Sequence, residues 1–226
     1  MEILSDFLPA FGSRDAAAGE TGVWFWRSYP NAAALQELPE QEQARVSRLV
    51  SSQKQDALAA SLVERRCLLS RLLDCDIRML SIAHDEAGRP YLPDHPDTAI
   101  SFSDSEGWNA LALSRTGVIG IDLEQLRELT WEPMLPMLAS EGEAPAIRDS
   151  VNGHGSTEPF FRCWTAKEAI LKAAGTGLKG GAPRILLPAG YIDARSDAFE
   201  LMHDGLSLEV ETVMAGQVIL TRAMQV

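Results

Sequence analysis

The stretch that most constrains the fold is residues 160–178, FFRCWTAKEAILKAAGTGL. Pro159 stands just before it and a glycine-rich segment follows it, which are the start and stop signals of a single helix. Most residues between these signals are strong helix formers. Trp164, Glu168 and Lys172 follow one another at four-residue intervals, so an aromatic ring, a carboxylate and an ammonium group share one stripe. Surface Glu–Lys pairs with this spacing support many helices, so the spacing alone favours a plain structural pair.

Composition places the chain among globular proteins of modest size. It has 226 residues, 46% of them hydrophobic, which is enough for one good core or for two small cores of roughly 100 residues each. No apolar run approaches the length of a membrane span, and acids stand in the N-terminal stretch where a secretory signal needs basic residues. We therefore expect a soluble, cytoplasmic protein without membrane association.

Cysteine, histidine and charge narrow the possible functions. Three cysteines without CxxC spacing indicate reduced thiols and argue against a zinc site, and the four histidines form no metal-ligand pattern. The net charge of −12 argues against nonspecific nucleic-acid binding. An anionic ligand would therefore need a local basic pocket or a metal ion to overcome the overall field.

The order of predicted elements indicates two halves of similar size. Residues 1–20 look like a flexible lead-in, and residues 132–158, broken by prolines and glycines, predict short helical pieces and a mobile NGHGS loop. The apolar patterns predict helices at 38–50, 56–73 and 160–178, and strands at 22–29, 98–103, 108–114, 118–123, 199–202, 206–214 and 217–224. This order is typical of an α+β fold, with halves at residues 21–112 and 113–226.

An acidic pair lies in the predicted strand IGIDLE. Because side chains alternate along a strand, Asp122 and Glu124 point to the same face. Two neighbouring carboxylates repel unless a cation or a proton lies between them. The pair is either a solvated strand end or the start of a hard-cation site, since oxygen ligands of this type suit Mg²⁺. In the second case Glu168 is the natural third ligand, and Lys172, one turn further on, supplies a positive charge for phosphate.

Together the two motifs resemble the signatures of the 4′-phosphopantetheinyl transferases. The sequences GIDLE and WTAKEAILKAAGTGL match the family patterns G-[IV]-D-x-E and W-x-x-K-E-[AS]-x-x-K, the second followed by a glycine and a leucine. The monomeric, surfactin-type branch fits best. The signature residues present in this chain are Gly120, Asp122, Glu124, Trp164, Lys167, Glu168, Ala169, Lys172, Gly177 and Leu178.

Weaker matches extend the resemblance over most of the chain. Arg89 lies in a GRP turn like the family's G-[KR]-P, whose basic residue contacts the 3′-phosphate of coenzyme A. Ser101 lies in ISFS, in place of the family's S-H-S segment, and Arg66 is similar to a basic residue that relatives place near the nucleotide. Two departures are visible. Phe102 replaces the family's phosphate-binding histidine, and an alanine-rich ALAAS stretch stands where relatives often carry a basic residue.

The resemblance implies a reaction and a fold. A serine of an apo acyl or peptidyl carrier protein attacks the β-phosphate of coenzyme A, takes the 4′-phosphopantetheine group and releases adenosine 3′,5′-bisphosphate, with Mg²⁺ or Mn²⁺ as the metal. The fold is a monomer of two pseudo-symmetric halves, each a small antiparallel sheet packed with a long helix. The active site lies in the cleft between the halves, with the nucleotide on the N-terminal side.

The same resemblance implies roles for single residues. Asp122, Glu124 and Glu168 hold the metal, and Lys172 stabilises charge on the phosphates. Glu168 also takes the serine proton, directly or through water, and the sequence does not separate its two roles. The residues expected to hold the adenosine end of coenzyme A are Arg66, Arg89 and Ser101.

Other functions remain open at this point. A Mg²⁺-dependent phosphohydrolase shares the acid cluster and the lysine but needs no protein acceptor, and a catalytically weakened carrier-binding module is consistent with Phe102. The acceptor could serve fatty acid, polyketide, nonribosomal peptide or lysine pathways. A carrier must dock on a basic or apolar surface of this acidic chain, and one apolar group either forms that surface or packs in the core. Its members are Trp131, Met134, Leu135, Met137 and Leu138.

Overall fold

The structure is a computed structural model that describes residues 8–11, 21–177 and 181–226. Its two antiparallel sheets and their helices confirm the predicted α+β class. Among the described helices, none combines the length and the apolar character that a bilayer crossing requires.

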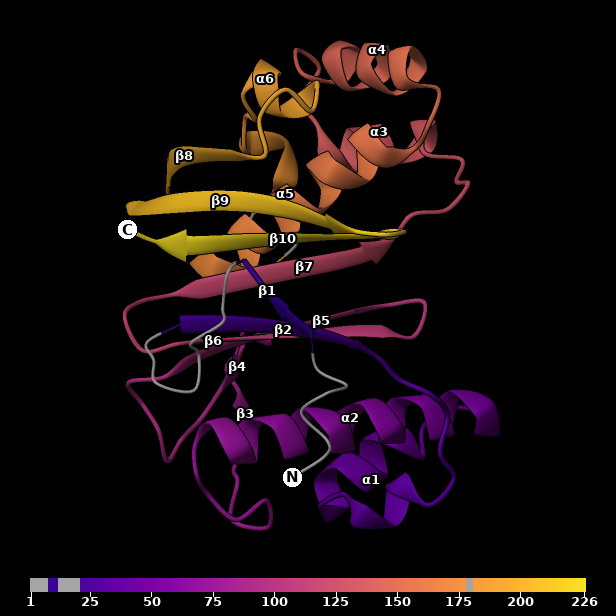
Figure 1. The fold of residues 1–226 in the computed structure, drawn as a ribbon, viewed down its shortest axis with the longest axis vertical. Helices are drawn as coiled ribbons and strands as arrows, with labels where there is room; N and C mark the ends of the chain where they lie inside the picture. The colour runs from indigo at the N-terminus through magenta and orange to yellow at the C-terminus, as the bar shows by residue number, and fades with distance from the viewer. Residues whose placement is uncertain (1–7, 12–20, 178–180) are drawn as a thin grey trace.

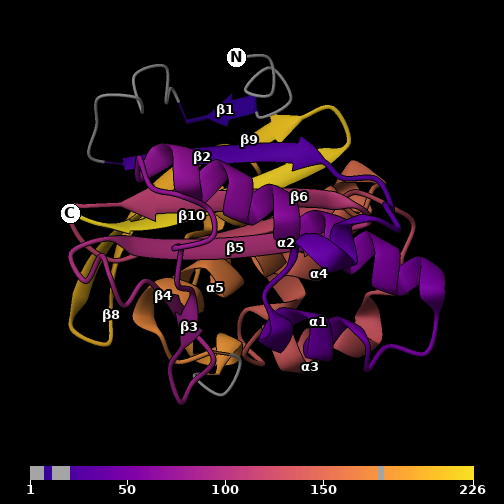
Figure 2. The same ribbon diagram turned by 90° about the horizontal axis from the view of Figure 1, so that it is seen from below.

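The first half is built on a six-stranded sheet. Its helices are η2 (Ala34–Glu37), α1 (Glu40–Val46) and α2 (Ser52–Leu72). Its strands are β1 (Leu8–Ala10), β2 (Thr21–Arg27), β3 (Ala83–His84), β4 (Pro90–Tyr91), β5 (Ala99–Ser105) and β6 (Trp108–Ser114), which pair in the order β1-β2-β6-β5-β4-β3. Figure 2 shows α2 crossing these strands, and its Leu68 and Leu69 pack in one cluster with Leu111 of β6.

The second half is built on a four-stranded sheet. Its strands are β7 (Ile119–Gln125), β8 (Ala198–His203), β9 (Leu206–Ala215) and β10 (Val218–Gln225), which pair in the order β7-β10-β9-β8. Its helices are η3 (Glu132–Met134), α3 (Leu135–Leu138), α4 (Ala144–His154), α5 (Glu158–Ala174), η5 (Ala182–Arg184) and α6 (Ala189–Ile192). The main core of this half surrounds α5, whose Phe160, Ile170 and Leu171 are fully buried.

The two halves repeat one pattern of connections. In each, a strand leads into a long helix and then into antiparallel strands, the last of which pairs with the first. The order β2-β6-β5-β4 corresponds to β7-β10-β9-β8, with α2 and α5 as the matching helices. Figure 1 shows the two sheets one above the other, with β7 as the strand of the second sheet nearest the first. Apolar side chains of both sheets form a shared core there, which includes Val23, Phe25, Ala110, Ile121, Leu123, Val218 and Leu220.

The helix predicted at 160–178 is α5, and its ends follow the sequence signals. Pro159 lies in its first turn, where a missing N–H is tolerated. Gly175 ends the helix in the left-handed conformation, with φ 71°. The predicted end at residue 178 is wrong, because the helix ends at Ala174 and residues 175–177 are not helical. Residue 178 itself lies outside the described residues. The predicted boundary between the halves at residue 112 lies within β6, close to its end at Ser114.

Two expectations about irregular segments are corrected. The NGHGS segment is not a loop, because α4 continues through His154 and ends at Gly155, which has φ 61°. Part of the expected lead-in is the strand β1, in which Leu8 pairs with Phe25 of β2. The rest of that lead-in, residues 1–7 and 12–20, lies outside the described residues.

The apolar residues of the 130s pack mostly inward. Trp131, Leu135 and Leu138 are 6%, 2% and 1% exposed and belong to the core around α5, and Met134 packs against the same core. Of this group Met137 alone is largely exposed, at 64%. The prolines of this segment divide it into the short helices η3 and α3, whose apolar sides face the core. The interpretation as a carrier-docking surface is therefore wrong for the three buried residues.

Candidate active site

The helix α5 lies directly on β7, and one glycine makes this contact possible. A side chain at Gly120 would collide with the backbone of Ala169 and Ala173 in the helix. Glycine therefore stands at this position because it alone has no Cβ. The alternation of the strand turns Asp122 and Glu124 to the side of Gly120, so both acids face the helix.

Lys172 of α5 reaches across to both halves. Its Nζ donates to Asp122 Oδ1 at 2.8 Å and to the Ile121 carbonyl at 2.9 Å, both in β7. It also donates to the Phe102 carbonyl in β5 at 3.3 Å. This ammonium group is therefore bonded between the two sheets, and the interpretation of a plain surface Glu–Lys pair does not describe it.

A row of serines on β5 fastens the two sheets together beside the acids. Ser101, Ser103 and Ser105 accept hydrogen bonds from the backbone N–H groups of Ile121, Leu123 and Gln125 at 3.1, 3.1 and 3.3 Å. Ser103 Oγ donates to Asp122 Oδ1 at 2.8 Å, and Ser105 Oγ donates to Glu124 Oε2 at 2.5 Å. Ser103 and Ser105 were not predicted as site residues, although their two-residue spacing matches that of the acids they hold.

The three predicted metal ligands have different surroundings. Asp122 is buried, and its Oδ2 has no hydrogen-bond partner within the described part of the chain. Glu124 Oε2 also accepts from Arg127 Nη1 at 2.9 Å. Burial, together with the charges of Asp122 and Glu124, raises the pKa of Glu168 to about 7, although Lys172 opposes the shift. The region therefore holds an excess of negative charge that the protein neutralises only in part.

The residues present fit a divalent cation through two of the three acids. Across residues 8–11, 21–177 and 181–226, no three His, Cys, Asp or Glu side chains are arranged as a metal site. Lys172 already pairs with Asp122, and Arg127 with Glu124. The unpartnered Oδ2 of Asp122 and the raised pKa of Glu168 are nevertheless what a hard-cation site shows without its cation. Asp122 and Glu168 fit the ion, and Glu124 is held by Arg127.

A basic pocket adjoins the acids. This cavity of about 240 Å³ lies between the halves and contains no acidic residue among its described lining. Lys172 belongs both to this lining and to the acid cluster. The lining also includes Arg45, Arg65, His84, Arg89, Ser101 and Phe102, with Gly175 and Gly177 just after α5. With Lys172, five basic side chains therefore line one pocket in a chain of strongly negative net charge.

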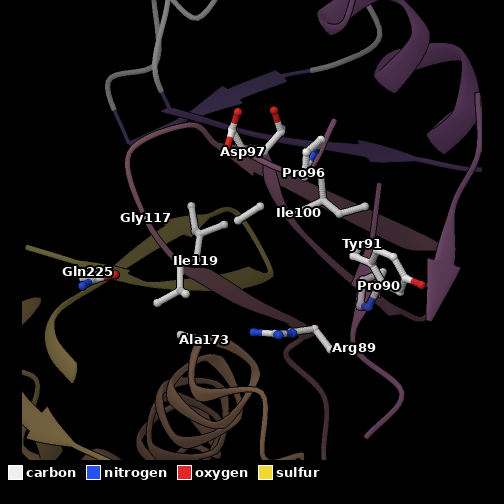
Figure 3. A pocket seen from close by; sticks show the side chains of 13 residues that line it. Arg89, Pro90, Tyr91, Pro96, Asp97, Ile100, Gly117, Ile119, Ala173 and Gln225 are labelled. Atoms are coloured by element: carbon white, nitrogen blue, oxygen red, sulfur yellow. The ribbon is translucent and has the colours of Figure 1, made fainter. Parts of the chain in front are cut away.

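A second cavity of about 330 Å³ shares Arg89, Pro90 and Ile100 with the basic pocket (Figure 3). Figure 3 shows the Arg89 side chain extending toward Ala173 near the end of α5, with Ile119 and Ile100 above it in the view. Arg89 Nε pairs with Asp85 at 3.2 Å, which fixes the arginine at the border of both cavities. The structure thus places the predicted Arg89 and Ser101 in the basic pocket together with Lys172.

The structure does not bring Arg66 into the basic pocket. Arg66 is 5% exposed and donates to Glu42 at 3.1 Å and to the Leu80 carbonyl at 2.6 Å. Its neighbour Arg65 lines the pocket instead, with its guanidinium 5.3 Å from the Phe102 ring and paired with Asp104 at 2.6 Å. Arg66 lines a neighbouring cavity of about 210 Å³ that shares Arg45, Arg65, His84 and Phe102 with the basic pocket. Its nucleotide contact stays a prediction.

Comparison with known proteins gives consistent descriptions. A family model described as the 4′-phosphopantetheinyl transferase superfamily matches residues 118–203, which include β7 and α5. A Synechocystis protein provisionally named as a 4′-phosphopantetheinyl transferase is 32% identical over 154 residues, 66% of this chain and 61% of its own. The L-aminoadipate-semialdehyde dehydrogenase-phosphopantetheinyl transferase of Eremothecium gossypii is 32% identical over 158 residues, 65% of this chain and 54% of its own.

A shorter relative is covered more completely. The 4′-phosphopantetheinyl transferase AcpT of Salmonella typhi is 30% identical over 165 residues, which are 73% of this chain and 82% of that protein. The matches to the two longer relatives span only 61% and 54% of their lengths.

Proposed function

Because this chain belongs to the 4′-phosphopantetheinyl transferase superfamily, we propose that it transfers the 4′-phosphopantetheine group of coenzyme A to a serine of an apo acyl or peptidyl carrier protein. The observation that carries the proposal is the position of Lys172. Its ammonium group lines the basic pocket and is bonded to Asp122 of the acid cluster. A polyphosphate held in that pocket therefore presents its phosphates beside the carboxylates.

In the proposed reaction the serine oxygen forms a bond to the β-phosphorus of coenzyme A. The bond from that phosphorus to the bridging oxygen breaks, and adenosine 3′,5′-bisphosphate leaves with the electron pair. Phosphoryl transfer of this kind requires mainly positioning and charge neutralisation from the protein. The basic side chains that bind the phosphates are Arg45, Arg65, Arg89 and Lys172.

Glu168 takes the proton of the serine in this scheme. A carboxylate whose pKa lies near 7 is suited to proton transfer at neutral pH, and Glu168 has that property because it is buried beside two other acids. Held by Asp122 and Glu168, with Glu124 as the predicted third ligand, Mg²⁺ or Mn²⁺ would neutralise charge on the pyrophosphate. We also propose that the chain belongs to the surfactin-type branch and that it is a cytoplasmic monomer. Its acceptor would be a carrier protein of polyketide or nonribosomal peptide biosynthesis.

Intact-mass spectrometry tests the proposal directly. An apo carrier protein incubated with this protein, coenzyme A and Mg²⁺ should gain the mass of one phosphopantetheine group. The gain should disappear with Glu168→Gln and persist with Glu158→Gln, which removes a carboxylate at the other end of the same helix. The assay should include acyl and peptidyl carriers.

The other outcomes of this assay identify the competing functions. Unchanged carrier mass with every carrier would contradict the transferase. If coenzyme A is hydrolysed without an acceptor, the chain is a phosphohydrolase, and if the carrier binds without gaining mass, the chain is a binding module.

A further inference from the structure

The carboxylate of Glu124 is already engaged by its own protein. It is 19% exposed, and one of its oxygens accepts from both Ser105 Oγ at 2.5 Å and Arg127 Nη1 at 2.9 Å. Asp122 is engaged in the same way, because its Oδ1 accepts from Lys172 Nζ and from Ser103 Oγ, each at 2.8 Å, but its Oδ2 is buried without a hydrogen-bond partner in the described part of the chain. Both acids on β7 are therefore tied to a serine and a basic side chain, and the buried oxygen without a partner belongs to Asp122.

Arg127 is fixed from three directions. Its Nη1 also donates to the Gln125 carbonyl at 2.9 Å, and its guanidinium lies 5.0 Å from the Phe161 ring of α5. Its own carbonyl accepts from Thr157 Oγ1 at 2.9 Å, just before that helix begins. Both the backbone and the head of Arg127 are thus attached around Glu124, and the pair is a built contact of the site.

Arg127 has a second acidic residue, Glu106, near its guanidinium group. Its Nε lies 3.9 Å from a carboxylate oxygen of Glu106, on the turn between β5 and β6. Glu106 is more than half exposed and Arg127 is 36% exposed, so the guanidinium can exchange one acid for the other at the surface. The pair with Glu106 is largely exposed, and exposed ion pairs contribute little each to the free energy of folding.

We propose that Arg127 is a positioning residue that holds Glu124 away from the cation, so that the site binds a divalent ion through Asp122 and Glu168 until Arg127 is displaced. This proposal rests on the cation site of the proposed function. Arg127 competes with the metal ion for one carboxylate, and its presence lowers the affinity of the site. The described structure shows the state in which Arg127 holds Glu124.

Mn²⁺ binding measured by electron paramagnetic resonance on the whole chain, without coenzyme A or carrier, tests the proposal. Arg127→Ala should bind Mn²⁺ about tenfold more tightly than wild type, because Glu124 becomes a third ligand. Arg127→Lys, which keeps the charge, should bind less tightly than Arg127→Ala. Arg148→Ala, which removes one positive charge from the exposed side of α4, should bind like wild type.

The gain must depend on Glu124. Glu124→Gln in the wild-type background should change the affinity about twofold or less, and Arg127→Ala with Glu124→Gln should lose the tenfold gain. Unchanged affinity in Arg127→Ala, or a gain that persists in the double variant, would overturn the proposal. Asp122→Asn tests the site itself. If Mn²⁺ binds that variant as it binds wild type, the cation site of the proposed function fails, whatever Arg127 does.

Discussion

Glu168 has the least favourable surroundings for a charge among the acids of the site. Burial removes water from its carboxylate, and the nearby carboxylates of Asp122 and Glu124 repel a further negative charge. Its pKa therefore rises from 4.5 to about 7 in the folded protein. The same property that suits the residue to accept a proton makes its ionised form costly to the fold.

The stability of the protein should therefore depend on pH through Glu168. Because its folded pKa exceeds its unfolded value, the contribution of this group is fully present below pH 4.5 and is lost as the pH rises through about 7. With EDTA present, we expect Glu168→Gln to be more stable than wild type by about 1–2 kcal/mol at pH 8, allowing for solvent screening. Urea unfolding at pH 5 should show a smaller difference. Equal differences at both pH values would contradict this account, and Glu158→Gln serves as the control.

At the scale of the element, the packing of α5 on β7 depends on the absence of one side chain. We expect Gly120→Ala to lower the free energy of unfolding by about 2–3 kcal/mol, because the new methyl group must push the helix away from the strand. Gly153→Ala is the matched control. A side chain there meets no atom within 4 Å and lies in α4, so it should leave stability unchanged or raise it by up to about 1 kcal/mol. Urea unfolding of both variants decides, and similar effects at the two sites would refute the steric explanation.

The elements that were predictable from sequence are those specified by local signals. The bounds of α5 follow from Pro159 and Gly175, and the strands follow from alternating side chains. The prediction of a loop at NGHGS is wrong. Its glycines suggest a turn, whereas packing of α4 against α5 and α6 keeps the segment helical up to Gly155. The sequence leaves open whether the apolar residues of the 130s pack in the core or form a docking surface. In a segment broken by prolines, an apolar side chain is equally consistent with a core and with an exposed patch.

The candidate site was predictable only where its residues share one element. The spacing of Asp122 with Glu124, and of Glu168 with Lys172, places each pair on one face. Ser103 and Arg127 act on these acids across or beside the sheet, and no local pattern reports such contacts. Arg65 and Arg66 are adjacent on α2, and the sequence does not say which of the two the packing turns into the pocket.

For the whole molecule, a net charge of −12 opposes the approach of an anion, so the basic pocket must overcome that field locally. We expect Arg65→Ala to weaken coenzyme A binding about tenfold, because it removes a cation that is held in place by Asp104 and Asn109. Isothermal titration calorimetry at two ionic strengths measures the effect, which should be smaller at high salt. Arg148→Ala is the control on α4. Equal binding by both variants would exclude Arg65 from the coenzyme A site.

The contacts of Lys172 place the candidate active site at the interface between the two halves. The ammonium group donates to the Phe102 carbonyl of one half and to Asp122 of the other. The serines of β5 add hydrogen bonds to the backbone of β7. A chain divided in the connection between Ser114 and Ile119 would yield two fragments, each carrying part of the site. Their reassociation would restore the basic pocket and the acid cluster together, so transfer activity would report assembly of the two halves.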